Sequence, residues 1–342
     1  MSQIRLPLVS TEFLTNHIVA DPLLTEDQKC NKFLMEALTC QLTEVSQPHE
    51  KCQTGTKHRN ESFHVFLVGG KRDIENANAM KECKVYNVSK EKHVSISSMN
   101  EKRYNHSAAS FNGVVYSVGG WNTGALKTAE CYDPVSKWWS YIAPMNSTRD
   151  SFGICTYNDL IYVVGGWDNS TVESYNPATN KWCFSQSIPA ITKSVNRATV
   201  AENNIYALTH PLGGNNVFHR FDPRDEKWYN LNEMQSTSSG QYELVSYDRT
   251  LFTIGRNECK WLDIRVNKWE PMPHMLSNRT GFSAVIVGKD IYVFGGKKEC
   301  NSFVTNVERF SVLNNEWTTV DSTEIYLFWG RAAVLSGEFD SN

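Results

Sequence analysis

The sequence predicts an all-β fold assembled from six repeated units, and three regularities in a fixed order support this prediction. A hydrophobic strand motif recurs along the chain, a hairpin follows each copy, and a methionine often closes the unit. The copies lie 40 to 50 residues apart, which is the size of one supersecondary unit. We therefore expect six similar sheets that stack on one another.

The strand motif combines β-branched and aromatic residues with a glycine pair, as in IYVVGGW at Ile161–Trp167. Glycine weakens a strand interior, so a recurring pair indicates a sharp turn with positive φ. Copies four and five lack the pair, and Gly213-Gly214 comes later, so altered connections are expected in those two units. The aromatic residues of the six copies are Phe66, Tyr116, Tyr162, Tyr206, Phe252 and Tyr292.

The hairpin pairs an aromatic or apolar residue with a tryptophan seven residues later. Proline restricts φ, and Asp or Asn closes a turn through its side chain, so Asp133-Pro134 and Asn176-Pro177 mark such turns. The first copy has His93 where a tryptophan is due. We assign the tryptophans to packing between sheets; they are Trp139, Trp182, Trp228, Trp269 and Trp317. The closing methionines are Met99, Met145, Met234 and Met275.

The strand motifs are apolar on both faces instead of alternating, which is typical of strands covered on both sides. Four-stranded sheets stacked radially satisfy this requirement and leave only short edges. The unit that begins at His64 has no strand before its glycine motif, whereas GRAAVLSG at Gly330–Gly337 is a spare strand. We expect this last strand to complete the first sheet and remove its open edge.

The glycine pair, the Tyr-Asp-Pro turn at Tyr132 and the spaced tryptophan resemble Kelch repeats, from about His64 to Gly337. The resemblance implies a six-bladed β-propeller over residues 63–337, followed by a tail at 338–342. Residues 330–336 would complete blade 1. The implied blades are 64–99, 103–145, 149–188, 192–234, 238–275 and 279–322.

Residues 1–45 lack strand patterning and predict two short helices, the second amphipathic and ending near Leu42. Two such helices bury too little apolar surface to fold alone. RLPLVSTEFL at Arg5–Leu14 resembles the end of a BACK domain, which precedes the propeller in Kelch-like proteins of BTB-BACK-Kelch layout. The resemblance implies a BACK remnant at 1–45, a linker at 46–62, and a fragment, isoform or truncated product without the BTB domain and most of BACK.

Composition argues against several classes of protein. The net charge of −3 is unlike the basic surface that nucleic acid requires. No apolar run is long enough to span a bilayer, and the first residues are too polar for a signal peptide. The nine cysteines are scattered singly, which favours reduced thiols. We expect a cytoplasmic protein with no nucleic-acid or membrane partner.

The sequence predicts no enzyme site. The histidines share no repeat register, and no pair falls at metal-ligand spacing. Neither a Gly-x-Ser-x-Gly motif nor a P-loop occurs. A copper site like that of galactose oxidase, with Tyr and His ligands from several blades, is the enzymatic alternative. We expect no catalytic residue, metal or cofactor.

The Kelch resemblance implies that a protein partner docks on the face formed by the loops after the glycine pairs and the loops that enter each blade. Aromatic and arginine side chains on such a rim suit partner binding, although any single charge there is also explained as merely solvated. The candidate rim residues are Lys71, Arg72, Arg103, Tyr104, Asn105, Trp121, Asn122, Arg149, Trp167, Asp168, Lys193, Asn196, His210, Arg256, Asn257, Arg279, Lys297, Lys298, Tyr326 and Arg331.

A basic sector is expected where the first and last blades meet in a closed ring. It would contain Lys71, Arg72, Lys297 and Lys298, flanked by Arg103, Arg279 and Arg331. Nearby Asp73, Glu299 and Glu324 would weaken it. We expect this sector to favour an acidic peptide motif.

The resemblance further implies the substrate-binding part of a cullin-3 ubiquitin ligase adaptor. Such adaptors engage cullin-3 through their BTB domain, so the chain as given is expected to bind a substrate without engaging the ligase. The alternative is an actin-binding cytoskeletal module, because some Kelch proteins bind actin.

Overall fold

The computed structural model describes residues 62–72, 78–189, 194–211, 215–231, 234, 242–299, 302–321, 325–337 and 339. These residues form strands, turns and loops and contain no helix. The helices expected in residues 1–45 and the linker up to residue 61 lie outside the described residues, as does Lys193.

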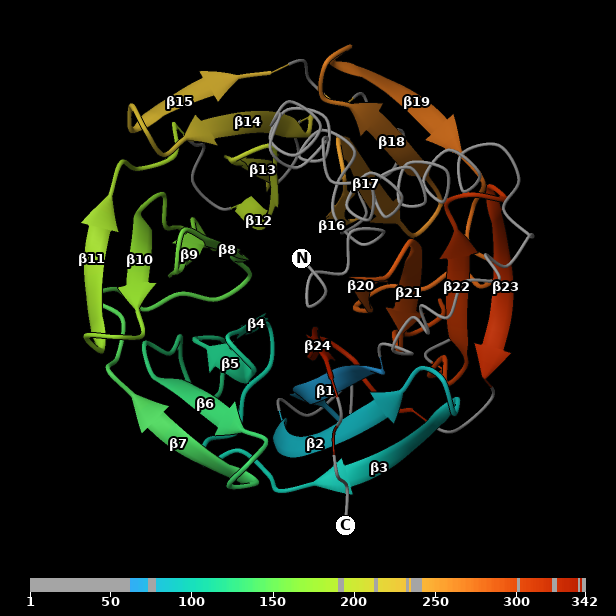
Figure 1. Ribbon diagram of the computed structural model, residues 1–342, viewed down its shortest axis with the longest axis horizontal. Coiled ribbons are helices and arrows are strands. Elements are labelled where there is room, and N and C mark those ends of the chain that lie inside the picture. The colour runs from blue at the N-terminus through green and yellow to red at the C-terminus, as the bar shows by residue number, and fades with distance from the viewer. Residues whose placement is uncertain are drawn as a thin grey trace, which may run out of the picture. The chain divides into compact units, whose positions relative to one another are not determined.

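The described chain forms a ring of six four-stranded antiparallel sheets, confirming the all-β, six-bladed propeller (Figure 1). The innermost strands are β24 (Arg331–Ser336), β4 (Ser107–Phe111), β8 (Gly153–Tyr157), β12 (Ser194–Ala201), β16 (Tyr242–Tyr247) and β20 (Ser283–Val287). The second strands are β1 (Phe63–Lys71), β5 (Val114–Val118), β9 (Leu160–Val164), β13 (Asn204–Pro211), β17 (Thr250–Gly255) and β21 (Asp290–Phe294).

Two further layers complete each sheet toward the outside of the ring. The third strands are β2 (Ala79–Asn87), β6 (Ala129–Asp133), β10 (Val172–Asn176), β14 (Val217–Asp222), β18 (Cys259–Asp263) and β22 (Val307–Ser311). The outermost strands are β3 (Lys92–Ile96), β7 (Trp138–Ile142), β11 (Lys181–Ser185), β15 (Lys227–Asn230), β19 (Lys268–Met272) and β23 (Glu316–Asp321).

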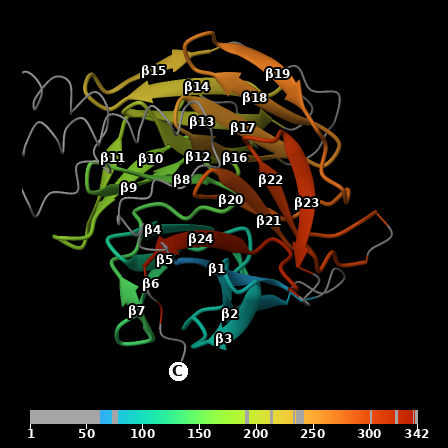
Figure 2. The ribbon, with the colours of Figure 1, turned by 45° about the vertical axis from the view of Figure 1, so that its right-hand side comes forward.

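The two ends of the ring meet in the first blade. The C-terminal strand β24 pairs antiparallel with β1, in a register that runs from Phe63 opposite Ser336 to Val68 opposite Arg331. In Figures 1 and 2 the red β24 accordingly lies beside the blue β1. Because β1 has β24 on one side and β2 on the other, neither of its edges is open.

The hydrophobic core lies between neighbouring blades, as the two-sided apolar strands predict. Phe66 and Val85 of the first blade pack with Tyr132 and Trp139 of the second. Four of the five register tryptophans also donate a hydrogen bond to the preceding blade: Trp139 Nε1 to Ser97 O at 3.0 Å, Trp182 Nε1 to Ala143 O at 2.7 Å, Trp228 Nε1 to Gln186 O at 2.9 Å and Trp317 Nε1 to Pro273 O at 2.8 Å. The tryptophans therefore join adjacent blades.

The glycine pairs adopt the positive φ angles that their position requires. Gly119 has φ of +58°, and a Cβ atom there would lie 2.7 Å from the carbonyl oxygen of Arg149. In the fourth blade, which lacks the pair, β13 runs on through Thr209 and His210 to Pro211. In the second, third and sixth blades the second strand ends directly before the glycine pair, whereas β1 continues through Gly69 and Gly70 to Lys71. The glycines let the next blade approach closely.

Gly119→Ala is expected to destabilise the propeller more than Gly288→Ala does. Gly288 has nearly the same φ of +60°, but a Cβ there meets nothing within 4 Å. Left-handed strain costs roughly 1–2 kcal/mol in both variants, whereas overpacking adds about 1–3 kcal/mol only at Gly119. Urea denaturation of both variants measures the difference in their free energies of unfolding. Equal unfolding midpoints would show that the close contact between Gly119 and Arg149 O adds nothing to the cost of the substitution.

Candidate functional site

The antiparallel sheets place both expected sets of loops on one face of the ring. The first residue of an inner strand lies opposite the last residue of the second strand, as Ser283 does opposite Phe294. The loops that enter each blade and the loops that follow the glycine pairs therefore share one end of the sheets. We call this end the rim face. It is the end of the ring where the sequence predicts partner binding.

Three of the proposed rim residues are interior, which corrects their expected role. Arg103, Arg149 and Arg279 have exposed fractions of 0%, 1% and 0%. Each guanidinium turns inward because carbonyl and carboxylate acceptors converge on it within its own blade. These arginines are not available to a partner on the surface.

The environment of Arg149 shows what these arginines do. Its Nη1 donates to the carbonyl oxygens of Gly165 and Thr171, both at 2.8 Å. Its Nη2 lies 2.5 Å from Oε1 of Glu173, and both side chains are fully buried. Glu173 also accepts the backbone N–H groups of Asn146 and Ser147. One ion pair therefore connects the glycine turn, the third strand and the loop that enters the blade.

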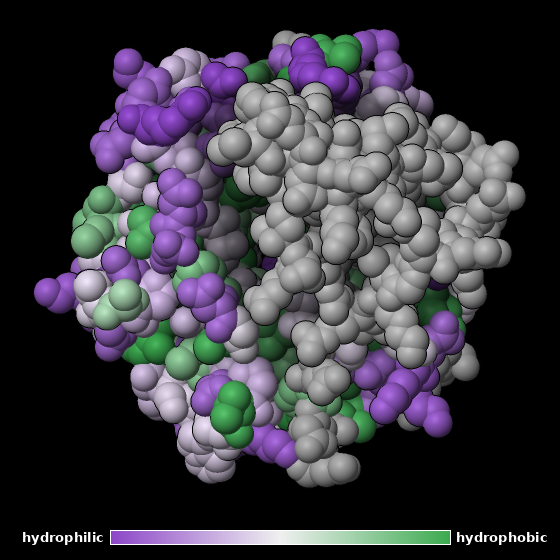
Figure 3. Space-filling model, viewed as in Figure 1, coloured by the Kyte–Doolittle hydropathy of each residue, from purple (hydrophilic) through white to green (hydrophobic). Residues whose placement is uncertain are grey.

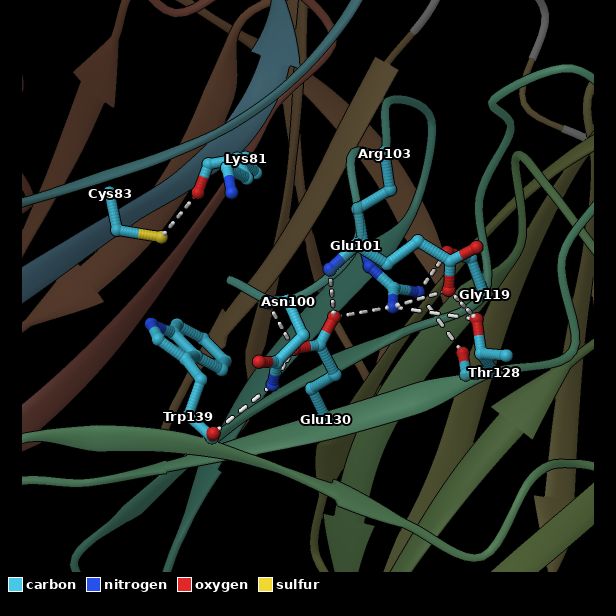
Figure 4. Close-up of polar contacts among 9 residues, drawn as sticks. All are labelled: Lys81, Cys83, Asn100, Glu101, Arg103, Gly119, Thr128, Glu130 and Trp139. Carbon is cyan, nitrogen blue, oxygen red and sulfur yellow. Dashed lines mark hydrogen bonds and ion pairs between the residues drawn. The ribbon is translucent and has the colours of Figure 1, made fainter. Parts of the chain in front are cut away.

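The same arrangement recurs in the second and sixth blades. Arg103 Nη2 lies 2.9 Å from Oε1 of Glu130, and its Nη1 donates to the carbonyl oxygen of Gly119 at 2.7 Å (Figure 4). Arg279 pairs with Glu308 and donates to Gly295 O at 3.0 Å. We call these three sets the arginine clamps. Burial lowers the pKa of Arg149 and Arg279, and the paired glutamates oppose this effect.

A signal for the clamps is present in the sequence but was missed. In each clamp the arginine lies 16 residues before the glycine whose carbonyl it binds. The paired glutamate follows the arginine by 27, 24 or 29 residues. When an arginine and an acidic residue recur at similar spacings in several repeats, a buried ion pair within the blade explains them better than a contact with a partner at the rim face.

Two more proposed rim residues have internal roles. Asn196 is fully buried; its Oδ1 accepts the N–H of Gly166 and its Nδ2 donates to Thr209 Oγ1 at 3.1 Å. Arg331 lies in the central channel, where its Nη1 is 2.8 Å from Oε1 of Glu243. The expected flanks of the basic sector, Arg103, Arg279 and Arg331, are therefore all buried and paired with glutamates.

Lys71 is held between aromatic rings where the first, second and sixth blades meet. Its Nζ lies 4.2 Å from the ring centre of Tyr104 and 4.8 Å from that of Trp329. Only 8% of the residue is exposed, and burial lowers the pKa of Lys71. Such cation–π contacts strengthen when the cation is desolvated. Lys71 thus stiffens this part of the rim face.

Further rings continue from Trp329 toward the surface. Phe328 stacks on Trp329 at 4.5 Å, and Phe303 contacts both Phe328 and Tyr326 through edge-on geometry. Lys297 Nζ lies 5.6 Å from the ring centre of Phe328. We call Tyr104, Phe303, Tyr326, Phe328 and Trp329 the aromatic cluster. Tyr326 is its exposed end, with 47% of the residue accessible.

Other predicted rim residues are distributed around the face. Tyr104 and Trp121 are joined by two backbone hydrogen bonds, and Asn105 N–H donates to Trp329 O. The exposed members are Arg72, Trp167, Asp168, Asn257, Lys298 and Tyr326. The half-buried members are Asn105, Trp121, Asn122, His210, Arg256 and Lys297. Trp167 in the third blade and His210 in the fourth stand apart from the aromatic cluster.

The fifth and sixth blades contribute a shallow cavity of about 430 Å³ lined by Arg256, Asn278, Lys298 and Glu299. Arg256 forms an ion pair with Glu299 at the edge of this cavity.

On the face shown in Figure 3, hydrophilic side chains dominate the visible margin of the described residues, and hydrophobic ones form separate spots.

Within the described ranges, no group of three or more His, Cys, Asp or Glu residues is placed to hold a metal ion. The same ranges contain no helix with the length and apolar character needed to cross a membrane. Burial raises the pKa of the Cys83 thiol to about 12, so this cysteine is protonated.

Comparisons with known proteins match this geometry. The Kelch motif model matches residues 102–146, 148–187 and 278–323, which are the three blades that contain arginine clamps. Kelch repeat protein C2 of Cowpox virus is 27% identical over 155 residues, covering 43% of this chain and 28% of that protein. Kelch-like protein 23 of Homo sapiens is 25% identical over 268 residues, covering 75% of this chain and 39% of that protein.

A solved structure, that of YjhT, superimposes with a TM-score of 0.59 at 17% sequence identity, covering 70% of this chain and 89% of that one. This likeness supports the fold alone. The chain spans well under half the length of the Kelch relatives named above. The chain is therefore a six-bladed β-propeller that contains Kelch motifs in its second, third and sixth blades and is similar in sequence to Kelch-like proteins and to viral Kelch repeat proteins.

Proposed function

We propose that the rim face of the sixth and first blades binds an acidic segment of a partner protein. The observation that carries this proposal is the aromatic cluster, a rigid stack that ends in the exposed ring of Tyr326 and is bordered by cationic side chains. Rigid aromatic and basic side chains supply most of the binding energy in many interfaces.

The surface charge of this region comes from fewer residues than the sequence suggested. Arg72 and Lys298 are exposed, and Lys297 is half-buried over Phe328. Glu82 lies 3.3 Å from Arg72, and Glu299 pairs with Arg256, so part of the positive charge is balanced. The remaining cations favour a partner segment with excess negative charge, and they act mainly on association rate and salt dependence.

Homology to Kelch-like proteins supports a finer proposal, in which the propeller is the substrate-binding part of a cullin-3 ligase adaptor. In adaptors of that layout the BTB domain engages cullin-3. We therefore expect the purified 342-residue chain to capture a protein substrate without capturing cullin-3.

The double variant Arg72→Glu, Lys298→Glu tests the proposed surface. We expect it to reduce partner capture roughly three- to tenfold, with a weaker salt dependence, because two attractive charges become repulsive. The measurement is quantitative mass spectrometry of proteins retained from cell extract by the immobilised chain, at low and high salt. Immunoblots of the same eluates for cullin-3 test the expectation that the purified chain does not capture cullin-3.

The matched control is Lys181→Glu, Lys227→Glu, which changes net charge equally. Both lysines are exposed at the start of outermost strands, at the end of the sheets opposite the rim face. Proteins lost with the rim variant and kept with the control variant are the partners. If no protein behaves this way, the rim proposal fails; co-sedimentation with actin filaments would then favour the cytoskeletal alternative.

A further inference from the structure

The centre of the ring contains a second candidate site, which no part of the proposed partner binding uses. The six innermost strands line a cavity of about 400 Å³, a size that suits a small molecule. Its walls are mainly small side chains, with three charged residues among them: Arg197, Glu243 and Arg331.

These three residues belong to one level of the channel. In each blade the residue at this level belongs to the innermost strand and pairs with the second-strand residue that directly precedes the position of the glycine pair. The six pairs are Arg331 with Val68, Ser107 with Val118, Gly153 with Val164, Arg197 with Leu208, Glu243 with Ile254 and Ser283 with Phe294. The second, third and sixth blades thus contribute only Ser, Gly and Ser. The strands β12 and β24, which carry Arg197 and Arg331, lie on opposite sides of the ring (Figure 1).

The charges at this level do not balance. Arg197 Nε lies 2.9 Å from Oε1 of Glu243, and Arg331 Nη1 lies 2.8 Å from the same oxygen. One carboxylate therefore serves two guanidinium groups and leaves one positive charge over. The side chains of both arginines are 9% exposed and that of Glu243 is 11% exposed, so bulk solvent screens this charge poorly.

The neighbouring titratable group does not compensate the excess charge. His106 is fully buried, and its backbone carbonyl accepts Nε of Arg331 at 2.9 Å. Burial first, and then the charges of Arg103 and Arg331, lower the pKa of His106 well below its usual range. Burial and the nearby Arg197 also lower the pKa of Arg331, to about 10, but that group still carries its charge at neutral pH.

Each guanidinium retains an unused donor. Arg197 uses Nε for Glu243 and Nη1 for the carbonyl oxygen of Asn196 at 2.8 Å. Arg331 uses Nε for His106 and Nη1 for Glu243. Among the described residues, neither Nη2 group has an acceptor, and both residues line the cavity. Two guanidinium groups that line one cavity, each with an unused donor and with excess positive charge between them, form a site for oxygen anions.

We propose that the central channel binds a small oxyanion, a carboxylate or a phosphate, between Arg197 and Arg331. The anion neutralises the charge that Glu243 leaves uncompensated. The two Nη2 groups would recognise the anion through charge-assisted hydrogen bonds. The small side chains that the second, third and sixth blades contribute leave room for the rest of the ligand.

Isothermal calorimetry on the full chain tests this site with inorganic phosphate, succinate and a blocked peptide containing one glutamate. Saturable binding of one equivalent is expected for at least one probe, and the preferred probe distinguishes a free anion from an acidic side chain of a partner. Arg197→Leu and Arg331→Met should each weaken binding about tenfold or more, because each removes a charge-assisted bond. Arg224→Ala, at an exposed turn, should leave it unchanged.

Glu243→Gln separates binding from a purely structural role. Removing the competing carboxylate raises the channel charge and should tighten anion binding about tenfold. A purely structural triad predicts weaker or unchanged binding in this variant. The proposal is overturned if no probe binds saturably to the wild-type chain, if Glu243→Gln fails to tighten binding, or if neither arginine variant weakens it. Partner capture by the rim face is measured separately, with the Arg72→Glu, Lys298→Glu variant.

Discussion

Glu173→Gln is expected to lower the free energy of unfolding by about 3–5 kcal/mol, because it leaves the buried guanidinium of Arg149 without its counter-charge. The substitution keeps the shape of the side chain, so packing between the second and third blades changes little. Urea denaturation followed by tryptophan fluorescence measures the effect as a lower midpoint with an unchanged slope.

Replacing both members of this clamp should not restore stability. In many proteins a buried ion pair can be replaced by apolar residues without loss of stability. Here Glu173 also accepts the N–H groups of Asn146 and Ser147, and Arg149 donates to two carbonyl oxygens. Arg149→Met with Glu173→Met therefore takes a hydrogen bond from four backbone groups, of which Thr171 O still accepts the N–H of Gly165.

The control for the clamp is Arg224→Ala, which breaks an exposed ion pair with Asp222. This variant should unfold at the wild-type urea concentration, since exposed pairs contribute little. A double Met variant as stable as the wild type would mean that the clamp is an ordinary ion pair and does not organise the blade.

Removing residues 331–342 is expected to abolish the monomeric fold. The deletion takes away β24, which pairs with β1 along six positions from Phe63 to Val68. The exposed edge of β1 would carry Val65 and Phe66, which are fully buried in the intact ring. An open, apolar strand edge recruits other chains. Light scattering after size-exclusion chromatography should show aggregates, and circular dichroism should show no cooperative unfolding.

A shorter deletion of residues 340–342 leaves β24 in place and should remain monomeric with nearly the wild-type melting temperature. Adding a synthetic peptide with the sequence of Gly330–Gly337 to the long deletion should recover part of the monomer, because it restores the missing strand. A long deletion that is monomeric and melts like the wild-type chain would show that closure contributes little to stability.

The fold was largely readable from the sequence because its signals are local and repeat. A strand that is apolar on both faces, such as Ile161–Val164, requires cover on both sides, and the spaced tryptophans require a neighbouring blade to receive them. The sequence also singled out Gly330–Gly337 as a spare strand, and in the structure β24 pairs with β1. Each of these inferences needs only residue type and spacing.

The rim was predicted less well because position in a loop does not state the direction of a side chain. Arg149 lies in an entry loop, where a long charged residue is normally solvated, but the carbonyl of Gly165 and the carboxylate of Glu173 converge on it. Lys71 likewise has the sequence context of a surface lysine and is buried between two rings.

By itself the sequence determined how many blades there are and which residues pack between them, because hydrophobic period and turn chemistry act over short stretches of chain. Only the tertiary structure decided which charges face inward. Arg197 and Arg331 are far apart in sequence and share one carboxylate only after the ring closes. Electrostatic pairing depends on distance in space, and that distance is set by the assembly of all six blades.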